Sequence, residues 1–236
     1  MNQPVRYVAM AFAILLSPGE ALALDTLLSP LYIAGKIGVS MMAASDITNT
    51  STLAPGQTAA SLTKTDSDGT VVPVGAAIGF NWSKHGIYLR TEFEYLNRSN
   101  FGYISNPLFT NSGTPIGLTS NIGSQTLFAN VYYDLHNATR FTPFVGGGIG
   151  AAINKSTTTL NRIGSPVFDT FQTTETKFAW NIGAGVAAHI TEIMLLELSY
   201  RYTDLGGAVW GNTSAIELTT TSLHANEFLF AARYQF

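Results

Sequence analysis

Four histidines and one acidic stretch are the residues whose types could support metal or proton chemistry. His85, His136 and His189 each fall in a short polar segment between two apolar ones, and His224 opens the last apolar segment. Imidazole binds metals and exchanges protons near neutral pH, but one histidine per segment is explained more simply by solvent-facing turns. The stretch Asp66–Gly69 lacks the bidentate glutamate of an EF-hand. We therefore expect neither a metal site nor a cofactor.

The other chemical signals also argue against catalysis. The chain has no cysteine, which excludes thiolate catalysis, disulfides and cysteine-ligated zinc. The glycine-rich stretch 146–150 is not followed by the Gly-Lys-Ser/Thr of a phosphate-binding loop. A net charge of −3 offers no basic surface to nucleic acid. We expect a protein that is not an enzyme and has no nucleic-acid partner.

Composition points instead to a large apolar surface. Hydrophobic residues make up 46% of the chain and charged residues 11%, whereas a soluble domain carries about 25% charged residues. Beyond the N-terminal segment no stretch is continuously apolar over the roughly 18 residues that a membrane-spanning helix needs. Two classes remain, a soluble β-protein and a membrane β-barrel.

Residues 1–23 have the form of a secretory signal peptide. Arg6 provides the positive start, residues 8–16 are apolar, and Ala21-Leu22-Ala23 has the small-x-small form of a cleavage site. The alternative is a membrane anchor, which needs about 20 apolar residues, more than this stretch contains. We expect an exported protein whose mature part begins at Leu24.

Hydrophobic alternation favours the membrane barrel. In residues 86–97, Ile87, Leu89, Phe93 and Tyr95 fall on one face and three charged side chains fall on the other. The same period-2 pattern, with one apolar face, recurs in every segment and indicates β-strands between lipid and a polar lumen. The eight segments are about 31–41, 71–82, 86–97, 125–135, 141–153, 176–188, 193–203 and 225–236.

The connections between these segments alternate in length. Three are short, at residues 83–85, 136–140 and 189–192. Four are long and rich in Ser, Thr, Asn and Gly, at about 43–70, 98–124, 154–175 and 204–224. Short periplasmic turns and long external loops are typical of outer-membrane barrels. The predicted fold is all-β, an eight-stranded antiparallel up-and-down transmembrane β-barrel formed by residues 24–236.

Several of these segments resemble a known family. Residues 142–150 (TPFVGGGIG), 177–187 (KFAWNIGAGVA), 196–206 (LELSYRYTDLG) and 226–236 (NEFLFAARYQF) are similar to OmpA-like and opacity-type outer-membrane β-barrel domains. Residues 31–40 (LYIAGKIGVS) resemble the rickettsial surface-antigen branch. The resemblance covers all eight strands and fails in the loops. It implies surface display in the outer membrane of a Gram-negative bacterium, and frequently adhesion or immune exposure.

Strand parity places five cations and five anions inside the predicted barrel. An eight-stranded barrel leaves an interior just wide enough for side chains, and unpaired buried charge is costly. We therefore expect these charges to pair into a network that plugs the lumen, with inward glycines making room. The ten residues are Lys36, Arg90, Glu92, Glu94, Asp134, Lys177, Glu197, Arg201, Glu227 and Arg233.

The chain ends in alternating aromatic residues. Phe228, Phe230, Tyr234 and Phe236 share one face of the last segment. This ending resembles the C-terminal signal that the barrel-assembly machinery reads, although an ordinary aromatic strand would look the same. We expect the assembly machinery and outer-membrane lipid as partners.

Any further function is expected in the external loops. Exposed aromatic residues often anchor a partner, although loop-to-loop packing would also explain them. The candidate contacts with a host-surface ligand are Phe101, Tyr103, Phe109, Phe168 and Phe171. The main hypothesis is a structural or adhesin-like surface antigen. The alternatives are a small-solute or ion porin, against which the balanced lumen charges argue, and a soluble lipocalin-like barrel, against which the outward aromatic faces argue.

Overall fold

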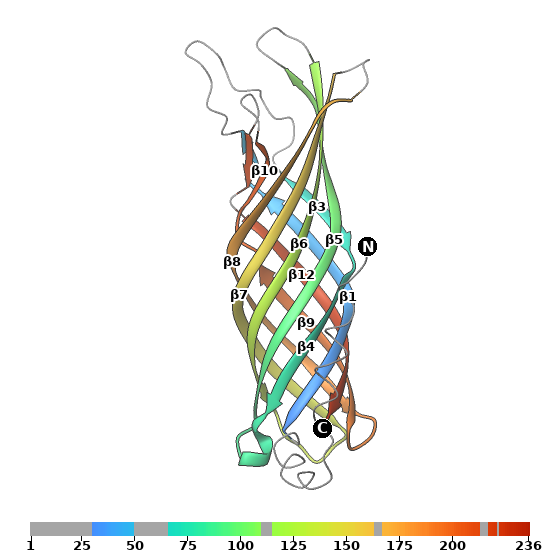
Figure 1. Cartoon of the computed structure of the whole chain (residues 1–236). Coiled ribbons are helices and arrows are strands. Elements are labelled where there is room, and N and C mark those ends of the chain that lie inside the picture. The colour runs from blue at the N-terminus through green and yellow to red at the C-terminus, as the bar shows by residue number, and fades with distance from the viewer. Residues whose placement is uncertain (1–29, 50–65, 110–114, 163–166, 213–216, 221) are drawn as a thin grey trace, which may run out of the picture.

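The computed structural model describes residues 30–49, 66–109, 115–162, 167–212, 217–220 and 222–236. The signal peptide expected at residues 1–23 lies outside these ranges. No helix in the described ranges is both long and apolar enough to cross a membrane. Almost all of the described chain is β-strand (Figure 1).

The strands form one closed antiparallel barrel. Hydrogen-bonded neighbours follow the order β12–β9–β8–β7–β6–β5–β4–β1, and pairing of β1 with β12 closes the sheet. β3 and β4 both pair with β1 and form two parts of one barrel strand interrupted at Val72. The described residues thus confirm the predicted eight-stranded up-and-down barrel. The barrel strands are β1 (Leu31–Ser45), β3 (Ser67–Val71), β4 (Pro73–Asn81), β5 (Leu89–Phe109), β6 (Pro115–Asp134), β7 (Phe141–Arg162), β8 (Val167–His189), β9 (Met194–Asp204) and β12 (Ser222–Gln235).

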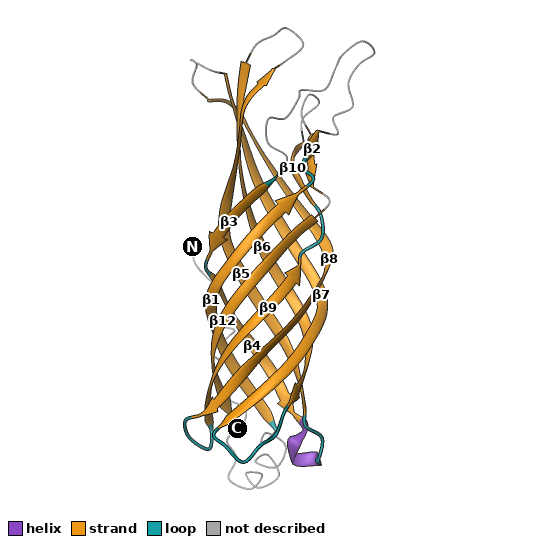
Figure 2. Ribbon diagram, turned by 180° about the vertical axis from the view of Figure 1, so that it is seen from behind, coloured by secondary structure: helices purple, strands orange, loops and turns teal. Residues whose placement is uncertain are grey.

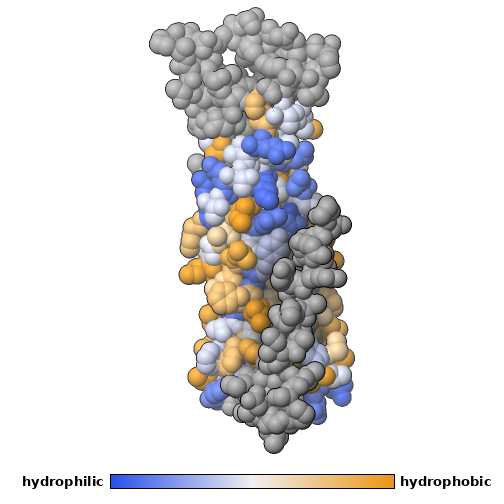
Figure 3. Space-filling view, in the orientation of Figure 1, coloured by the Kyte–Doolittle hydropathy of each residue, from blue (hydrophilic) through white to orange (hydrophobic). Residues whose placement is uncertain are grey.

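Alternation along each strand separates a lipid-facing surface from a packed interior. On β1, Tyr32, Ala34 and Lys36 are buried, whereas Ile33 and Ile37, at alternate positions to them, are exposed. The period of two follows from the pleat of the strand. Hydrophobic side chains gather around the middle of the visible face, and hydrophilic ones lie above them (Figure 3). In a membrane this band faces lipid, which explains why many large apolar residues are exposed without penalty.

Short connections close one end of the barrel. They join β4 to β5, β6 to β7 and β8 to β9, and the first contains the 3-10 helix η1 (Trp82–His85) (Figure 2). Gly86 ends η1 with a φ of 76°, in the left-handed region that glycine occupies without strain. The C-terminus lies at this same end (Figure 1). Following the habit of outer-membrane barrels, we call this end periplasmic.

At the external end, four strands continue beyond the barrel wall. The predicted loops at 98–124 and 154–175 are mostly strand, because β5 pairs with β6 up to Phe109 and Pro115, and β7 pairs with β8 up to Asn161 and Val167. These two segments were expected as loops, but their described residues extend the barrel strands. Polar Ser, Thr and Asn residues are as suitable for a water-exposed hairpin as for a loop, so composition alone does not distinguish a hairpin from a loop. A small sheet of β2 (Thr48–Asn49), β10 (Ala208–Asn212) and β11 (Glu217–Thr220) lies beside them.

The external half of the barrel interior contains a cluster of buried apolar side chains, beside buried Ser, Thr and Asn residues. We call this cluster of buried side chains the apolar plug. It lies where the ladders of β1, β9 and β12 end, between the external surface and the charged interior described below. Its members are Met42, Ala44, Ile47, Val71, Phe101, Ile122, Phe128, Ala152, Ala179, Leu205, Ala208, Leu223 and Ala225.

Candidate functional site in the barrel lumen

Six buried charges form a chain of ion pairs across the middle of the lumen, here called the central ion group: Glu92, Lys36, Glu94, Arg201, Glu227 and Arg98. Lys36 Nζ lies 2.6 Å from both Glu92 Oε1 and Glu94 Oε2. Arg201 joins Glu94 Oε1 at 2.7 Å to Glu227 Oε2 at 2.8 Å. Arg98 Nε completes the chain 2.8 Å from Glu227 Oε1. Three cations face three anions, so the group is neutral.

A second set of charges, the periplasmic ion group, lies nearer the short turns. Arg90 joins Asp134 at 2.9 Å and Glu197 at 3.1 Å. Arg233 Nη1 also lies 2.9 Å from Glu197 Oε1 but lacks hydrogen-bond geometry, so this contact is an ion pair only. The Arg90 guanidinium stands 4.9 Å from the ring centroids of both Tyr132 and Phe144. Two cations therefore face two anions, and stacking on aromatic rings holds one cation in place.

Neutral polar side chains complete the hydrogen bonding of the central carboxylates. The Tyr32 and Tyr132 hydroxyls and the Asn130 amide donate to Glu92 at 3.2, 3.3 and 3.4 Å. Thr203 Oγ1 donates to Glu227 at 3.0 Å. Buried ion pairs are tolerated when the geometry is good and the remaining lone pairs are satisfied. These extra donors meet that condition for Glu92 and Glu227.

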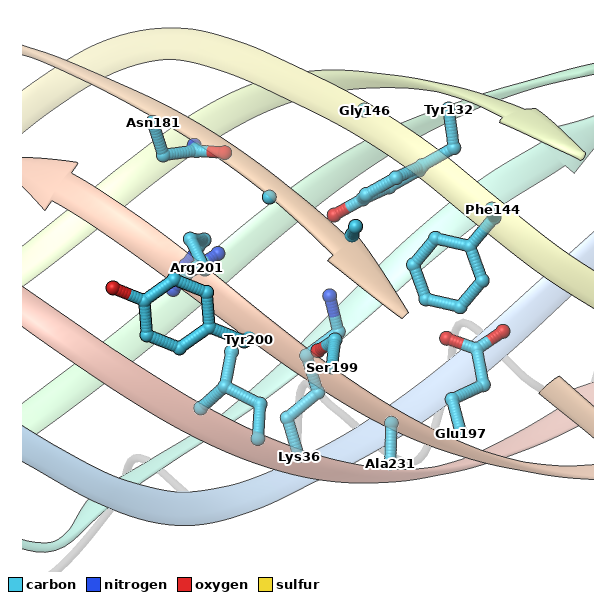
Figure 4. Close-up of a pocket in the computed structure, with 13 residues that line it drawn as sticks. Lys36, Tyr132, Phe144, Gly146, Asn181, Glu197, Ser199, Tyr200, Arg201 and Ala231 are labelled. Atoms are coloured by element: carbon cyan, nitrogen blue, oxygen red, sulfur yellow. The ribbon is translucent and has the colours of Figure 1, made fainter. Parts of the chain in front are cut away.

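Little space remains between the charged side chains. A cavity of about 20 Å³ lies among Lys36, Tyr132, Phe144, Glu197 and Arg201, which point toward it from different strands (Figure 4). That volume is room for about one water molecule. Gly146 and Gly183 line the same cavity, and a Cβ on Gly146 would collide with the Tyr132 ring, so glycine there leaves room for that ring. The lumen at this level is thus filled by protein.

The structure brings together nine of the ten charged residues expected in the lumen and separates one. Lys177 is 40% exposed and pairs with Glu175 at 2.9 Å, away from both ion groups. Its place on the inward side was expected, but it lies on a part of β8 that has passed the end of the pairing with β9 at Trp180 and Asp204. Its inclusion in the lumen network was therefore wrong.

Arg98 is the charge that the sequence analysis placed in an external loop. It is fully buried and pairs with Glu227. Counting by two from Arg90 through Glu92 and Glu94 reaches Arg98, so strand parity contained the signal. Because residues 98–124 were assigned to a loop, this parity was not applied to Arg98.

Two of the five candidate ligand contacts face inward. Phe101 is 5% exposed and belongs to the apolar plug, and Phe171 is half-buried against it. Both interpretations as exposed ligand contacts were wrong, because the extended strands carry these rings into the interior. Tyr103, Phe109 and Phe168 belong to β5 and β8, but their side chains lie outside the described part of the structure.

The remaining candidate residues lie on the barrel exterior or in its turns. Phe228, Phe230, Tyr234 and Phe236 are exposed on the outer face of the last strand, with Tyr234 and Phe236 in edge contact at 5.1 Å. The histidines stand apart, His85 against Trp82 and His136 stacked on Tyr88. In the described ranges no three acidic or histidine side chains gather as metal ligands would.

The closed barrel with its exposed apolar side chains is also found by comparison with known proteins. A family model described as the outer membrane protein beta-barrel domain matches residues 11–236. The chain belongs to this family. As a member of the outer membrane protein beta-barrel domain family, it is a protein of the bacterial outer membrane, and its exposed apolar side chains face lipid.

Individual relatives are more distant. The outer membrane protein PagN of Salmonella typhimurium is 25% identical over 87% of this chain and 90% of its own length. An uncharacterized protein of Rickettsia prowazekii, RP788, is 38% identical but over 32% of this chain and 47% of its own length. Among solved structures, Neisserial surface protein A is 14% identical, with a TM-score of 0.43 over 88% of this chain and 98% of its own. PagN, which matches this chain over most of both lengths, is thus another outer-membrane protein.

Proposed function

We propose that this family member is a surface-exposed, non-enzymatic outer-membrane protein, structural or adhesin-like, whose function lies in its external segments. The observation that carries the proposal is the double closure of the lumen. The two ion groups occupy its periplasmic and central parts, and the apolar plug lies in its external part together with buried Ser, Thr and Asn residues. A protein without an open path through its barrel acts through the surfaces it displays.

The composition of the lumen supports this against the porin alternative. Each ion group is neutral by itself and each charge is paired at hydrogen-bond or ion-pair distance. A permanently open pore keeps its charges in water, with an aqueous channel at its centre. Here an ion would have to break several buried pairs and then cross the apolar plug. Both steps are costly in a low-dielectric interior.

The external end has the form of a binding platform. Strands β5 to β8 continue as paired hairpins past the barrel wall, and the small sheet of β2, β10 and β11 stands beside them (Figure 1). Loops on such a rigid scaffold are where binding residues concentrate. The ligand we propose is a molecule of the host surface.

Single-channel recording separates the two functions. Protein refolded without residues 1–23 is inserted into a planar bilayer, and insertion is verified by its β-sheet circular dichroism and protection from protease. We expect no conductance steps. Reproducible ion-selective steps from folded protein would reject the closed barrel and favour the porin.

A binding measurement then tests the adhesin-like function directly. Cells displaying the full chain, and cells displaying a variant with short Gly-Ser turns in place of residues 110–114 and 163–166, are compared for attachment to host cells. We expect attachment by the first and a reduced level with the second. Equal attachment of both, at equal surface amounts, would place the binding elsewhere.

A further inference from the structure

The periplasmic ion group contains more buried hydrogen-bond donors than acceptors. The side chains of Arg90 and Arg233 are 1% and 4% exposed, yet among the described residues no acceptor forms a hydrogen bond with Arg90 Nη2, Arg233 Nε or Arg233 Nη1. Both oxygens of Asp134 and Oε1 of Glu197 already accept from other nitrogens of Arg90. A buried donor without an acceptor is costly, so these guanidinium groups are able to bind a further acceptor.

Charge is also unevenly distributed within this group. Glu197 Oε1 lies 3.1 Å from Arg90 Nη1 and 2.9 Å from Arg233 Nη1, so two guanidinium groups stand side by side on one carboxylate oxygen. Among the described residues, Arg233 has Glu197 as its single ion-pair partner. The second anion, Asp134, pairs with Arg90, and 16% of its side chain reaches solvent, where water screens its charge more than that of a buried group. The fully buried part of the group therefore holds two cations and one anion.

We infer that the periplasmic ion group binds a small inorganic anion, chloride under physiological conditions, between the guanidinium groups of Arg90 and Arg233. A halide ion only accepts hydrogen bonds, as the unsatisfied nitrogens require, and hydrogen bonds between two charged partners are the strong ones. Its charge also offsets the second cation. A water molecule would accept from the same nitrogens, but it carries no charge, and its own two hydrogens would need further acceptors.

The packing at this level favours a monatomic anion over a larger one. Tyr132 and Phe144, whose rings lie against Arg90, point with Glu197 toward the cavity of about 20 Å³ described above (Figure 4). Room for about one water molecule is the scale of the free space here. A phosphate or a carboxylate ligand would have to displace these rings, whereas a single ion requires only a small rearrangement of the arginine side chains.

Solvent reaches this group from the periplasmic end of the barrel. The side chains of Asp134 and Glu197 are 16% and 9% exposed, whereas the carboxylates of the central ion group are 1% exposed or less. An anion therefore enters from the periplasm and stops below the central ion group. Such a site binds an ion without conducting it. The inference does not depend on the adhesin-like function, which concerns the external segments, so either can fail without the other.

Urea unfolding at constant ionic strength tests the inference. The refolded protein is compared in sodium gluconate, whose anion is too large for the site, and in mixtures in which chloride replaces gluconate. Unfolding is followed by tryptophan fluorescence. A ligand that binds only the folded state stabilises it in proportion to the logarithm of the ligand concentration once the site fills. We expect the urea midpoint of the parent protein to rise with chloride in this logarithmic way.

Two substitutions of Arg233 and one control locate the effect. Arg233→Met removes one cation and its unsatisfied donors, while Glu197 keeps its hydrogen bond from Arg90, so this variant should have the same urea midpoint in chloride and in gluconate. Arg233→Lys keeps the charge but loses the Nε donor, and its midpoint should begin to rise only at a higher chloride concentration. The matched control is Lys177→Met, which removes a cation outside both ion groups and should keep the full chloride effect.

An equal urea midpoint of the parent protein in chloride and in gluconate would overturn the inference. So would an equal rise in the parent and in Arg233→Met, which a general effect of chloride on the chain would produce. Where Arg233→Met does not refold, a rise in Arg233→Lys that begins at the same chloride concentration as in the parent has the same meaning. Crystals grown in sodium bromide locate the ion directly. The anomalous signal is expected beside Arg90 and Arg233, and bromide bound only at the protein surface would reject the site.

Discussion

Glu227 is the residue on which most charge pairing in the lumen converges. Its two carboxylate oxygens accept from Arg98 and Arg201, and Thr203 donates a further hydrogen bond. We expect Glu227→Gln to leave the buried Arg98 guanidinium without its anion and Arg201 with Glu94 alone, and to reduce the free energy of unfolding by about 3–5 kcal/mol. Equilibrium urea unfolding in detergent or lipid measures this loss.

The matched control for this residue is Glu175. It pairs with Lys177 at 2.9 Å, but both side chains are partly in water, with 27% and 40% exposed. Exposed pairs contribute about 0–1 kcal/mol, so Glu175→Gln should have little effect on unfolding. Equal losses for the two substitutions would show that the lumen pairs do not hold the barrel together.

At the scale of the element, a β-bulge in β5 decides where Phe101 points. The register with β6 shifts between Arg98 and Phe101, so one extra residue lies on β5 and both side chains face inward. Phe101 then packs over β3, where a Cβ on Gly69 would come within 2.8 Å of it. Glycine at position 69 therefore makes room for the ring.

We expect Phe101→Ala to cost about 3–5 kcal/mol in the free energy of unfolding, because it opens a cavity in the apolar plug. Ile104, on the same strand, is 59% exposed, and Ile104→Ala should change stability by less than about 0.5 kcal/mol. The same urea titration compares them. If Phe101→Ala were as mild as Ile104→Ala, the plug would not be a packed core.

The last strand carries the prediction about biogenesis. The outward aromatic residues of β12 end at Phe236, which contacts Tyr234. If the assembly machinery reads this ending, deletion of Phe236 should lower the amount of folded protein in the outer membrane without a matching loss of refolding in vitro. Tyr133→Ala, at the same rim on β6, serves as the control. A normal amount of folded protein in the outer membrane after the deletion would show that these residues form only an ordinary aromatic rim.

At the scale of the whole molecule, closure of the lumen predicts which positions reagents can reach. The chain contains no cysteine, so a single introduced thiol reports on its own site. In intact cells, a membrane-impermeant maleimide should label Gln172→Cys on the external hairpins and leave Ala225→Cys in the apolar plug unmodified. Glu192→Cys, in a periplasmic turn, should react only after the membrane is permeabilised. Labelling of Ala225→Cys in the folded protein would indicate a water-filled lumen.

Local pattern was sufficient for the barrel itself. An eight-stranded barrel was predicted from the alternation in segments such as 86–97, the three short connections and the low content of charged residues. The alternation arises because one face of each strand contacts lipid and the other the polar lumen, so the two faces differ in polarity. The same parity placed Lys36, Glu94, Arg201 and Glu227 inside. Parity missed Arg98 because its segment was not recognised as strand, and it placed Lys177 in the lumen network, from which the structure separates it.

The partners inside the lumen and the extent of the external strands required the tertiary structure. Glu227 pairs with Arg98, which is 129 positions away in the sequence. Neither residue's sequence neighbours indicate this pairing, because it depends on the closure of the sheet and the register of its strands. The bulge that turns Phe101 inward is likewise a property of paired strands. The sequence by itself determines which side of a strand faces lipid, because the polarity of each side chain has to suit lipid or lumen at its own position. Only the closed sheet determines which side chains contact each other.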